Sequence, residues 1–362
     1  MTDSKPSLTG GVHRLHTIEA ARGLASGGVC LFHSLASLEP SNLHPVMRVL
    51  QLLTNPGWLG VDVFFVLSGW CIAERLAAAR RRGESAGVFL RERALRIFPT
   101  YWAALALALA LRLIAVPFNH TTVASNLPAT AQGWIADLLL INPYLDVPFS
   151  LTVSWSLVYE LGFYGLAAAV LVLGRRALSP VSLVILGLLL CLWPWLDLDL
   201  KPTFVLGRWP EFFAGVLGWW GARGRSFADH WRRAALLGLL LLLGLVSPSS
   251  YGGIRHMVAV GTAAALWIFS ARDRVATVNP LLHALGWVGG FSYSLYLIHL
   301  AVLSPFMNLA QRVVRPSHLL FGVVWLAALS VSVAAGWCLN HWVEAPVERW
   351  RKTRWARPPA HA

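Results

Sequence analysis

Apolar stretches separated by short polar or basic segments occupy almost the whole chain. Each stretch is close to the length of about 17–25 residues that an α-helix needs to cross a bilayer. They lie at roughly 18–38, 57–76, 100–118, 154–173, 180–197, 204–221, 234–248, 254–271, 281–304 and 319–343. The pattern predicts an all-α integral membrane protein, a bundle of about ten transmembrane helices with residues 1–350 in a single domain. The tail at 351–362 is basic and contains proline, and we expect it to be disordered.

Composition favours a membrane protein over other classes. The chain is 56% hydrophobic and 13% charged, whereas soluble domains have about 25% charged residues. Of the 30 Lys and Arg residues, 22 fall on the side of the N-terminus, five on the other side and three inside the stretches. This asymmetry predicts that both termini are cytoplasmic, and it accounts for the net charge of +13 without a nucleic acid partner. The four cysteines lie in apolar stretches without metal-binding or disulfide spacing, so we expect no bound metal.

Two polar side chains, Arg22 and His33, lie inside the first apolar stretch. Their spacing places both on one helix face, about 16 Å apart along the helix axis. Charged side chains inside a membrane span are costly and usually face a protein interior or a water-filled cavity. The pair therefore indicates either a functional site or a structural arrangement, in which Arg22 bonds to Glu19 and His33 bonds to a carbonyl group.

A second arginine pair, Arg93 and Arg96, precedes the third stretch in the loop RERALRIFPTYW. Three residues apart, the two share a helix face, and Tyr101 follows at the depth of the membrane interface. One interpretation is that the arginines only anchor this end of the span in the cytoplasm. The other is a clamp for phosphate groups, because arginine binds phosphate oxygens bidentately.

Polar side chains also mark the outer part of several other spans. They are Asp62, Ser156, Glu160, Tyr164, Arg208 and His299. A carboxylate such as that of Glu160 needs a partner inside the membrane, for example Arg208, although Arg208 and Glu211 could also satisfy each other. Together with the cytoplasmic arginines, these residues predict one continuous polar path through the bundle. A transporter would have a similar path.

Seven stretches, in this order, resemble motifs of the membrane-bound acyltransferase-3 family. They read RGLASGGVCLFH, GVDVFFVLSG, RERALRIFPTYW, SWSLVYELGFY, RWPEFFAG, FSYSLYLIHL and VEAPVERW. The first holds an element of that family, an arginine and a histidine separated by ten residues, at Arg22 and His33. The resemblance covers about residues 15–350. One departure is minor: the family often has aspartate before Arg-Gly, whereas this chain reads IEAARG with Glu19.

The resemblance implies an enzyme of the bacterial inner membrane that transfers an acyl group across the bilayer. The implied donor is cytoplasmic acyl-CoA, usually acetyl-CoA. The implied acceptor is a hydroxyl of an extracytoplasmic or lipid-linked glycan, such as a lipopolysaccharide or an exopolysaccharide. His33 would be the general base, and Glu160 would orient it or bind the sugar. The implied CoA-binding residues are Arg22, Arg93, Arg96 and Tyr101, and the implied substrate-binding residues are Asp62, Ser156, Tyr164, Arg208 and His299.

Two other classes of function stay open on the sequence alone. One is a glycolipid transporter or flippase that uses the same polar path, although the chain has no internal repeat of the kind found in many transporters. The other is a non-catalytic subunit of a polysaccharide assembly machine. Turnover of acyl-CoA would separate the enzyme from both alternatives.

Overall fold

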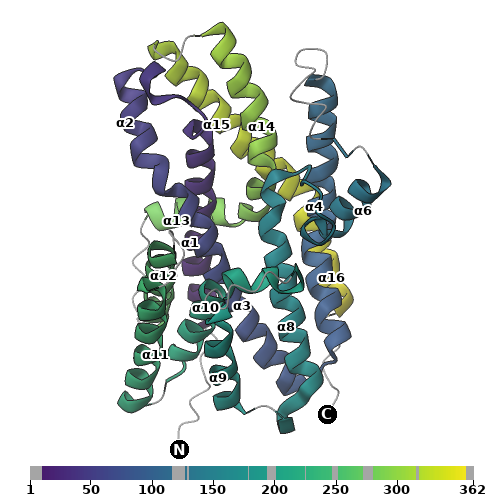
Figure 1. Ribbon diagram of the computed structural model, residues 1–362, viewed down its shortest axis with the longest axis vertical. Helices are drawn as coiled ribbons and strands as arrows, with labels where there is room; N and C mark the ends of the chain where they lie inside the picture. Colours follow the sequence, from purple (N-terminus) through teal and green to yellow (C-terminus); the bar gives the residue numbers. More distant parts are fainter. Residues whose placement is uncertain are drawn as a thin grey trace, which may run out of the picture.

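The computed structural model describes residues 10–115, 127–128, 130–177, 179–193, 201–224, 226–246, 252–271, 280–314 and 318–355. These residues form helices and no strands, which confirms the expectation of an all-α protein. The α-helices are α1 (Gly10–Leu35), α2 (Pro45–Thr54), α3 (Gly60–Arg82), α4 (Ala86–Ala115), α6 (Ala131–Leu139), α7 (Asn142–Leu145), α8 (Trp155–Ala177), α9 (Pro180–Leu190), α10 (Trp209–Gly221), α11 (Phe227–Leu245), α12 (Gly252–Ala271), α13 (Pro280–Gly289), α14 (Ser292–Val313), α15 (Leu319–Leu339) and α16 (Ala345–Trp355). Shorter elements include η2 (Asn55–Leu59), η4 (Thr152–Ser154), η6 (Lys201–Arg208) and the π-helical turn η7 (Asn340–Glu344). The longer helices run mostly along the long axis of the molecule, and the short α13 lies across it (Figure 1).

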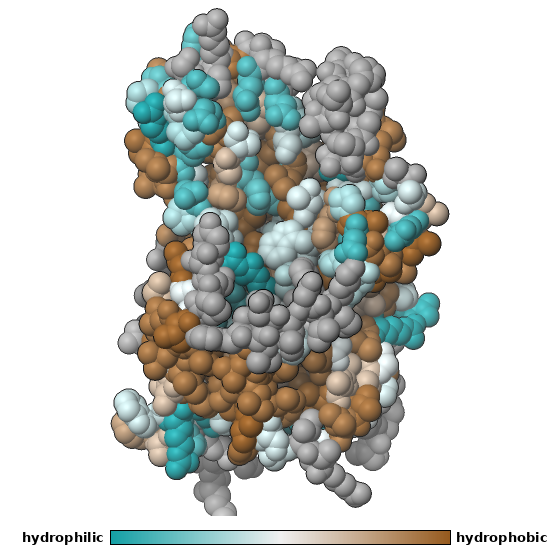
Figure 2. Space-filling model, viewed as in Figure 1, coloured by the Kyte–Doolittle hydropathy of each residue, from teal (hydrophilic) through white to brown (hydrophobic). Residues whose placement is uncertain are grey.

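Four segments of the described residues are long and apolar enough to cross a membrane. They are Pro45–Arg82, Ala86–Ile114, Thr152–Gly174 and Leu319–Arg354. The bent pair of α13 and α14 makes a fifth if it counts as one span, and α9 and α12 are shorter apolar helices. Figure 2 shows a broad band of hydrophobic residues across the lower half of one face. Large apolar side chains such as Val172 and Leu242 are 75% and 60% exposed, which suits contact with lipid.

The ninth stretch expected to span the membrane, 281–304, is not one helix. It consists of α13 and α14, which meet at a bend of 72°. The α13 backbone lies directly against α1: a Cβ on Gly289 would sit 1.8 Å from the carbonyl oxygen of Glu19, and one on Gly23 would sit 1.9 Å from that of Leu285. Only glycine permits such an approach, so this contact fixes where α13 crosses α1.

The loop expected before the third stretch is helical as well. Residues 91–99 belong to α4, although Pro99 lies inside that helix and removes one of its backbone hydrogen bonds. The segment is rich in arginine, glutamate, alanine and leucine, and these strong helix formers offset the loss. The consequence is that Arg93 and Arg96 project from a regular helix.

The expected tail also begins with helix. Residues 351–355 continue α16, where Glu348 pairs with Arg351 and Lys352 at 2.7 and 3.4 Å. Such pairs three and four residues apart stabilise a helix, which explains why the helix continues into the expected tail. Residues 356–362 lie outside the described residues.

The turn between α3 and α4 is held by charged side chains. Gly83 adopts a left-handed conformation with φ of 65° and ends α3. Arg75 donates to the carboxylates of Glu84 and Glu92 at 2.5 and 2.7 Å. Burial by itself would raise the pKa of Glu84, but the hydrogen bonds and charges of Arg75 and Arg82 outweigh it and hold that pKa below its usual value. These contacts fix the first turns of α4.

The core lies where α3, α8 and α10 meet. A Cβ on Gly69 of α3 would lie 2.0 Å from the carbonyl oxygen of Phe212, and one on Gly215 of α10 would lie 2.0 Å from that of Val66. The two helices therefore touch through their backbones. On the α8 side, the rings of Phe163 and Phe212 lie 4.0 Å apart between centroids. This close packing holds α3 in place along one side of the cavities described next.

Candidate functional site

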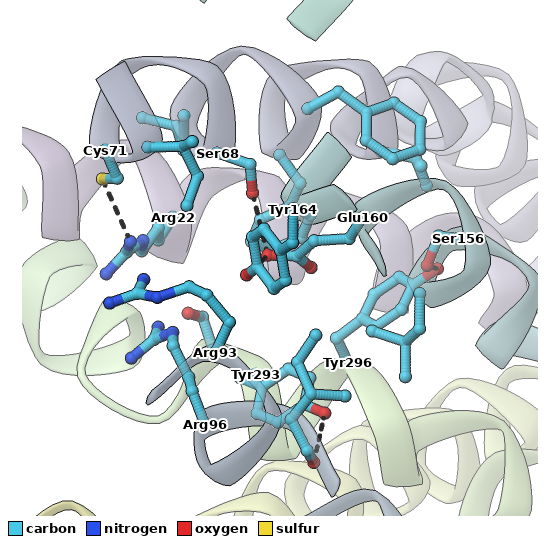
Figure 3. Close-up of a pocket in the computed structure, with 18 of the residues that line it drawn as sticks. Arg22, Ser68, Cys71, Arg93, Arg96, Ser156, Glu160, Tyr164, Tyr293 and Tyr296 are labelled. Carbon is cyan, nitrogen blue, oxygen red and sulfur yellow. Dashed lines mark hydrogen bonds between the residues drawn. The ribbon is translucent and has the colours of Figure 1, made fainter. Parts of the chain in front are cut away.

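A cavity of about 190 Å³ lies among α1, α3, α4, α8, α14 and α16 (Figure 3). We call it the arginine cavity. Its lining includes Arg22, Val61, Phe64, Ser68, Cys71, Arg93, Arg96, Ser156, Glu160, Tyr164, Tyr293, Tyr296 and Arg351. Figure 3 shows the guanidinium groups of Arg22, Arg93 and Arg96 gathered at one end, with Ser156 and Tyr296 at the other.

Two of these arginines have no carboxylate in direct contact among the described residues, although Glu160 and Glu344 are near enough to Arg96 to interact with its charge. Arg22 of α1 donates a hydrogen bond to the sulfur of Cys71 at 3.5 Å, and sulfur is a weak acceptor. Among the described residues, neither Arg22 nor Arg96 has a carboxylate within ion-pair distance. Inside a membrane protein, such cations need an anionic partner or water.

The other two arginines have one carboxylate each. Arg93 lies over the ring of Tyr164 at 5.9 Å and has Glu92 at 4.0 Å, with 12% of its side chain exposed. Arg351 of α16 binds Glu348 at 2.7 Å. Taken together, this end of the cavity keeps an excess of positive charge on forked guanidinium groups. It is suited to bind an anion with several oxygens, such as phosphate.

The middle of the arginine cavity holds a carboxylate. Glu160 of α8 accepts hydrogen bonds from Ser68 of α3, at 3.2 Å, and from Tyr164 one turn further along α8. His33 lines a different cavity, and its hydrogen bonds involve other groups. Among the described residues, Glu160 and His33 therefore share no hydrogen bond, and they line different cavities.

A second cavity of about 220 Å³ contains His33, and we call it the histidine cavity. Its lining includes Phe32, His33, Trp58, Val61, Asp62, Val153, Trp155, Arg208, Arg255 and Tyr296. The guanidinium of Arg208 lies 3.5 Å from Asp62 and 3.4 Å from Glu211, so it bridges two buried carboxylates. It also lies over the ring of Trp155 at 5.8 Å. Polar groups beside indole rings suit a ligand that has both hydroxyl groups and apolar faces.

Hydrogen bonds specify the tautomer of His33. Nδ1 of His299 lies 2.7 Å from the carbonyl oxygen of Tyr296, and a carbonyl only accepts, so this nitrogen carries the proton. In the neutral ring, Nε2 of His299 is then an acceptor, and it lies 3.3 Å from Nδ1 of His33. The carbonyl of Val29 accepts from the same Nδ1 at 3.0 Å. Neutral His33 is therefore protonated on Nδ1, and its Nε2 keeps a lone pair.

Val61 and Tyr296 line both cavities and separate them. The hydroxyl of Tyr296 lies 3.0 Å from the carbonyl oxygen of Val153, to which it donates, and 2.9 Å from Oγ of Ser156. The sequence analysis expected one continuous polar path. The structure shows two cavities that adjoin at side chains of α3 and α14.

The residues proposed from sequence are distributed between these two cavities. The arginine cavity contains Arg22, Arg93, Arg96, Ser156, Glu160 and Tyr164, and the histidine cavity contains His33, Asp62 and Arg208. His299 lines neither: it is 1% exposed and touches His33 rather than a cavity. Tyr101 is also elsewhere, because its buried hydroxyl donates to the carbonyl of Asp137 at 2.7 Å. Its hydroxyl thus connects α4 to α6 and lines neither of the two cavities.

The site residues proposed from sequence did not include two residues that line the cavities, although the shared helix face of Tyr296 and His299 was noted. Arg351 lies among basic residues that read as an orientation signal, and only the fold of α16 brings it to the cavity. Tyr296 lies one turn before His299 in the motif FSYSLYLIHL, on the same helix face. That spacing was the available signal, but it could not reveal that the tyrosine separates two cavities.

Comparison with known proteins now gives the class of this chain. A family model described as an acyltransferase domain matches residues 15–341, so the chain belongs to the acyltransferase-3 family and is a membrane acyltransferase. The chain is 28% identical over 300 residues to the exopolysaccharide production protein ExoZ of Rhizobium meliloti (strain 1021). The aligned region covers 77% of this chain and 84% of that protein. It is 31% identical over 159 residues to the acyltransferase MdmB of Streptomyces mycarofaciens, and the aligned region covers 42% of this chain and 38% of that protein. No solved structure matches the chain. The family expected from the motifs is confirmed.

Proposed function

We propose that this enzyme moves an acyl group, usually acetyl, from cytoplasmic acyl-CoA to a hydroxyl of an extracytoplasmic or lipid-linked glycan. The observation that carries the proposal is the meeting of two cavities at Val61 and Tyr296, one ending in arginines and the other containing His33. A donor with phosphate groups and an acceptor with hydroxyl groups can thus enter from different ends. They would react where the cavities meet.

The arginine cavity suits CoA because CoA carries phosphate groups at one end and the thioester at the end of a long arm. The phosphates would bind the cluster of Arg22, Arg93, Arg96 and Arg351. Further along the cavity, the carboxylate of Glu160 can accept a hydrogen bond from the amides of the arm. The thioester would then lie at the far end, beside Tyr296.

His33 is the proposed general base. Its Nε2 lone pair would take the proton from the acceptor hydroxyl as the oxygen bonds to the thioester carbonyl carbon. The carbon–sulfur bond then breaks, and the leaving thiolate of CoA takes the proton back from the imidazolium. The products are an ester and free CoA, and His33 returns to the neutral form.

The histidine cavity is the proposed acceptor site. Trp58 and Trp155 offer flat apolar surfaces for a sugar ring, and Asp62 and Arg208 lie beside them to bind hydroxyl groups. The relative ExoZ is named for exopolysaccharide production, which supports a glycan as the acceptor class.

The proposed setting is the bacterial inner membrane, crossed by ten helices with both termini in the cytoplasm. The excess of Lys and Arg on one side of the predicted spans supports this orientation. In Figure 1 the start of α1 and the end of α16 both lie in the lower half of the molecule. The arginine cavity would then open toward cytoplasmic CoA.

Inverted membrane vesicles that contain the protein and its native glycan provide the test. With labelled acetyl-CoA, we expect protein-dependent release of CoA and an equal amount of alkali-labile label on glycan. Movement of glycan without CoA release would support a transporter instead. Deletion of the protein should remove the O-acetyl decoration and leave the glycan chain; loss of the chain itself would point to an assembly subunit.

A further inference from the structure

The two cavities share only Val61 of α3 and Tyr296 of α14 among the described residues that line them. Tyr296 is 6% exposed and is held at both its hydroxyl and its ring. The hydroxyl bonds to Val153 and Ser156 at 3.0 and 2.9 Å, and the ring packs edge-on against Phe64 at 5.7 Å. These contacts hold Tyr296 in place at the boundary of the two cavities, beside which Val61 also lies, and we call these two residues the wall.

The chemistry of the proposed function requires the reacting carbon to lie at this wall. His33 lines the histidine cavity, and its Nδ1 is engaged by Val29 and His299, so the acceptor hydroxyl must reach Nε2 on that side. The thioester enters past the arginines on the other side. Its carbonyl carbon and the attacking oxygen can therefore meet only between Val61 and Tyr296.

We propose that Val61 and Tyr296 limit the length of the acyl group and thereby select acetyl over longer chains. This inference rests on the proposed function. Carbons beyond the thioester carbonyl have to lie against the wall or pass through it. On the far side they would displace the acceptor and contact the ion pair of Arg208 and Asp62, which disfavours apolar groups. The methyl group of an acetyl thioester is short enough to avoid both displacing the acceptor and contacting the ion pair. Each further methylene of a longer acyl chain extends toward them.

The test measures kcat/KM for acetyl-, propionyl- and butyryl-CoA in the same inverted vesicles. We expect the wild type to prefer acetyl over propionyl by about tenfold or more, the usual discrimination for one methylene in a closed apolar site. Val61→Ala removes two methyl carbons from the wall. It should lower the preference for acetyl over propionyl by about tenfold.

A second variant, expected to change the acyl preference in the opposite direction, distinguishes the proposed role of Val61 from a general loss of folding. Val61→Leu adds bulk to the wall and should raise the preference for acetyl over propionyl, whatever its effect on total activity. The matched control is Val63→Ala, two residues further along α3, where the side chain lines neither cavity. Its acyl preference should equal that of the wild type.

The outcomes separate the two proposals. Opposite shifts in Val61→Ala and Val61→Leu, with none in Val63→Ala, support the wall. Unchanged preference in both Val61 variants, while acetyl transfer continues, would overturn the wall and leave the proposed function standing. A wild type that releases no CoA from any of the three thioesters would overturn both.

Discussion

The position of one proton decides which ring nitrogen of His33 can act as the base. The carbonyl oxygens of Val29 and Tyr296 accept hydrogen bonds from Nδ1 of His33 and Nδ1 of His299, respectively. These fixed acceptors, each on the same helix as its histidine, align the two rings without any carboxylate. This arrangement differs from bases that are oriented by an aspartate.

Replacing the proposed base tests this view. His33→Ala should lower acetyl transfer by about 10²–10⁴-fold, the usual contribution of a general base. The measurement is label transferred from acetyl-CoA to glycan, normalised to the amount of protein in the membrane. The matched control is His318→Ala, which removes an exposed histidine just before α15 and should leave transfer unchanged. Wild-type transfer in His33→Ala would remove His33 from the mechanism.

His299 should act through His33 as a positioning residue. His299→Phe keeps a ring at this buried position but removes the nitrogen that accepts from His33. We expect kcat to fall by about tenfold or more, a part of the 10²–10⁴-fold that the base supplies, while KM for acetyl-CoA is unchanged. His299→Gln can offer an oxygen acceptor and should recover part of kcat. A rise in KM with normal kcat would contradict this role.

At the scale of helices, the proposed acyl-CoA site depends on α16, which reaches the arginine cavity beside α1 and α4. Arg351→Ala should raise KM for acetyl-CoA by about tenfold with a smaller change in kcat, because one charged hydrogen-bond donor to phosphate is lost. The comparison is Arg354→Ala, an exposed arginine on the same helix. If both substitutions change KM equally, Arg351 acts through the overall charge of α16 and not through a direct contact.

The close crossing of α3 and α10 is a second feature at this scale. In Gly215→Ala, the added Cβ would lie 2.0 Å from the carbonyl oxygen of Val66, so the helices must separate. We expect a lower yield of folded protein and a lower melting temperature in detergent, consistent with a cost of more than about 1–3 kcal/mol. Gly165→Ala on α8 meets nothing within 4 Å and should be neutral or slightly stabilising. Equal effects of the two substitutions would disprove this close crossing.

At the scale of the whole molecule, the proposed function requires the two cavities to open toward different sides of the membrane. The proposed orientation predicts that the turn between α3 and α4 is cytoplasmic and the segment after α1 is external. In a background without the four native cysteines, Ser85→Cys should react with an impermeant thiol reagent only in inverted vesicles, and Ser41→Cys only in intact spheroplasts. Labelling of both from one side would refute the orientation.

Much of this architecture follows from local properties of the chain. Hydropathy predicted helices such as α3, α8 and α15, because an apolar run of this length has few other stable structures in a bilayer. The bend between α13 and α14 was not predictable, since it depends on the contact of Gly289 with a segment of α1 far away in sequence. The helical course of α4 through Pro99 was also not predicted, because a proline usually ends a helix, whereas here the strong helix formers around it offset the lost hydrogen bond.

The sequence by itself determined the class of the protein and the polar residues from which its site is built, because residue type and helical spacing are local quantities. Only the tertiary structure decided how these residues group: Arg351 joins the other arginines, Tyr101 is excluded, and Glu160 is separated from His33. The wall of Val61 and Tyr296 also emerges only there. Its two members lie on different helices, and nothing local to either helix specifies that both line the same two cavities.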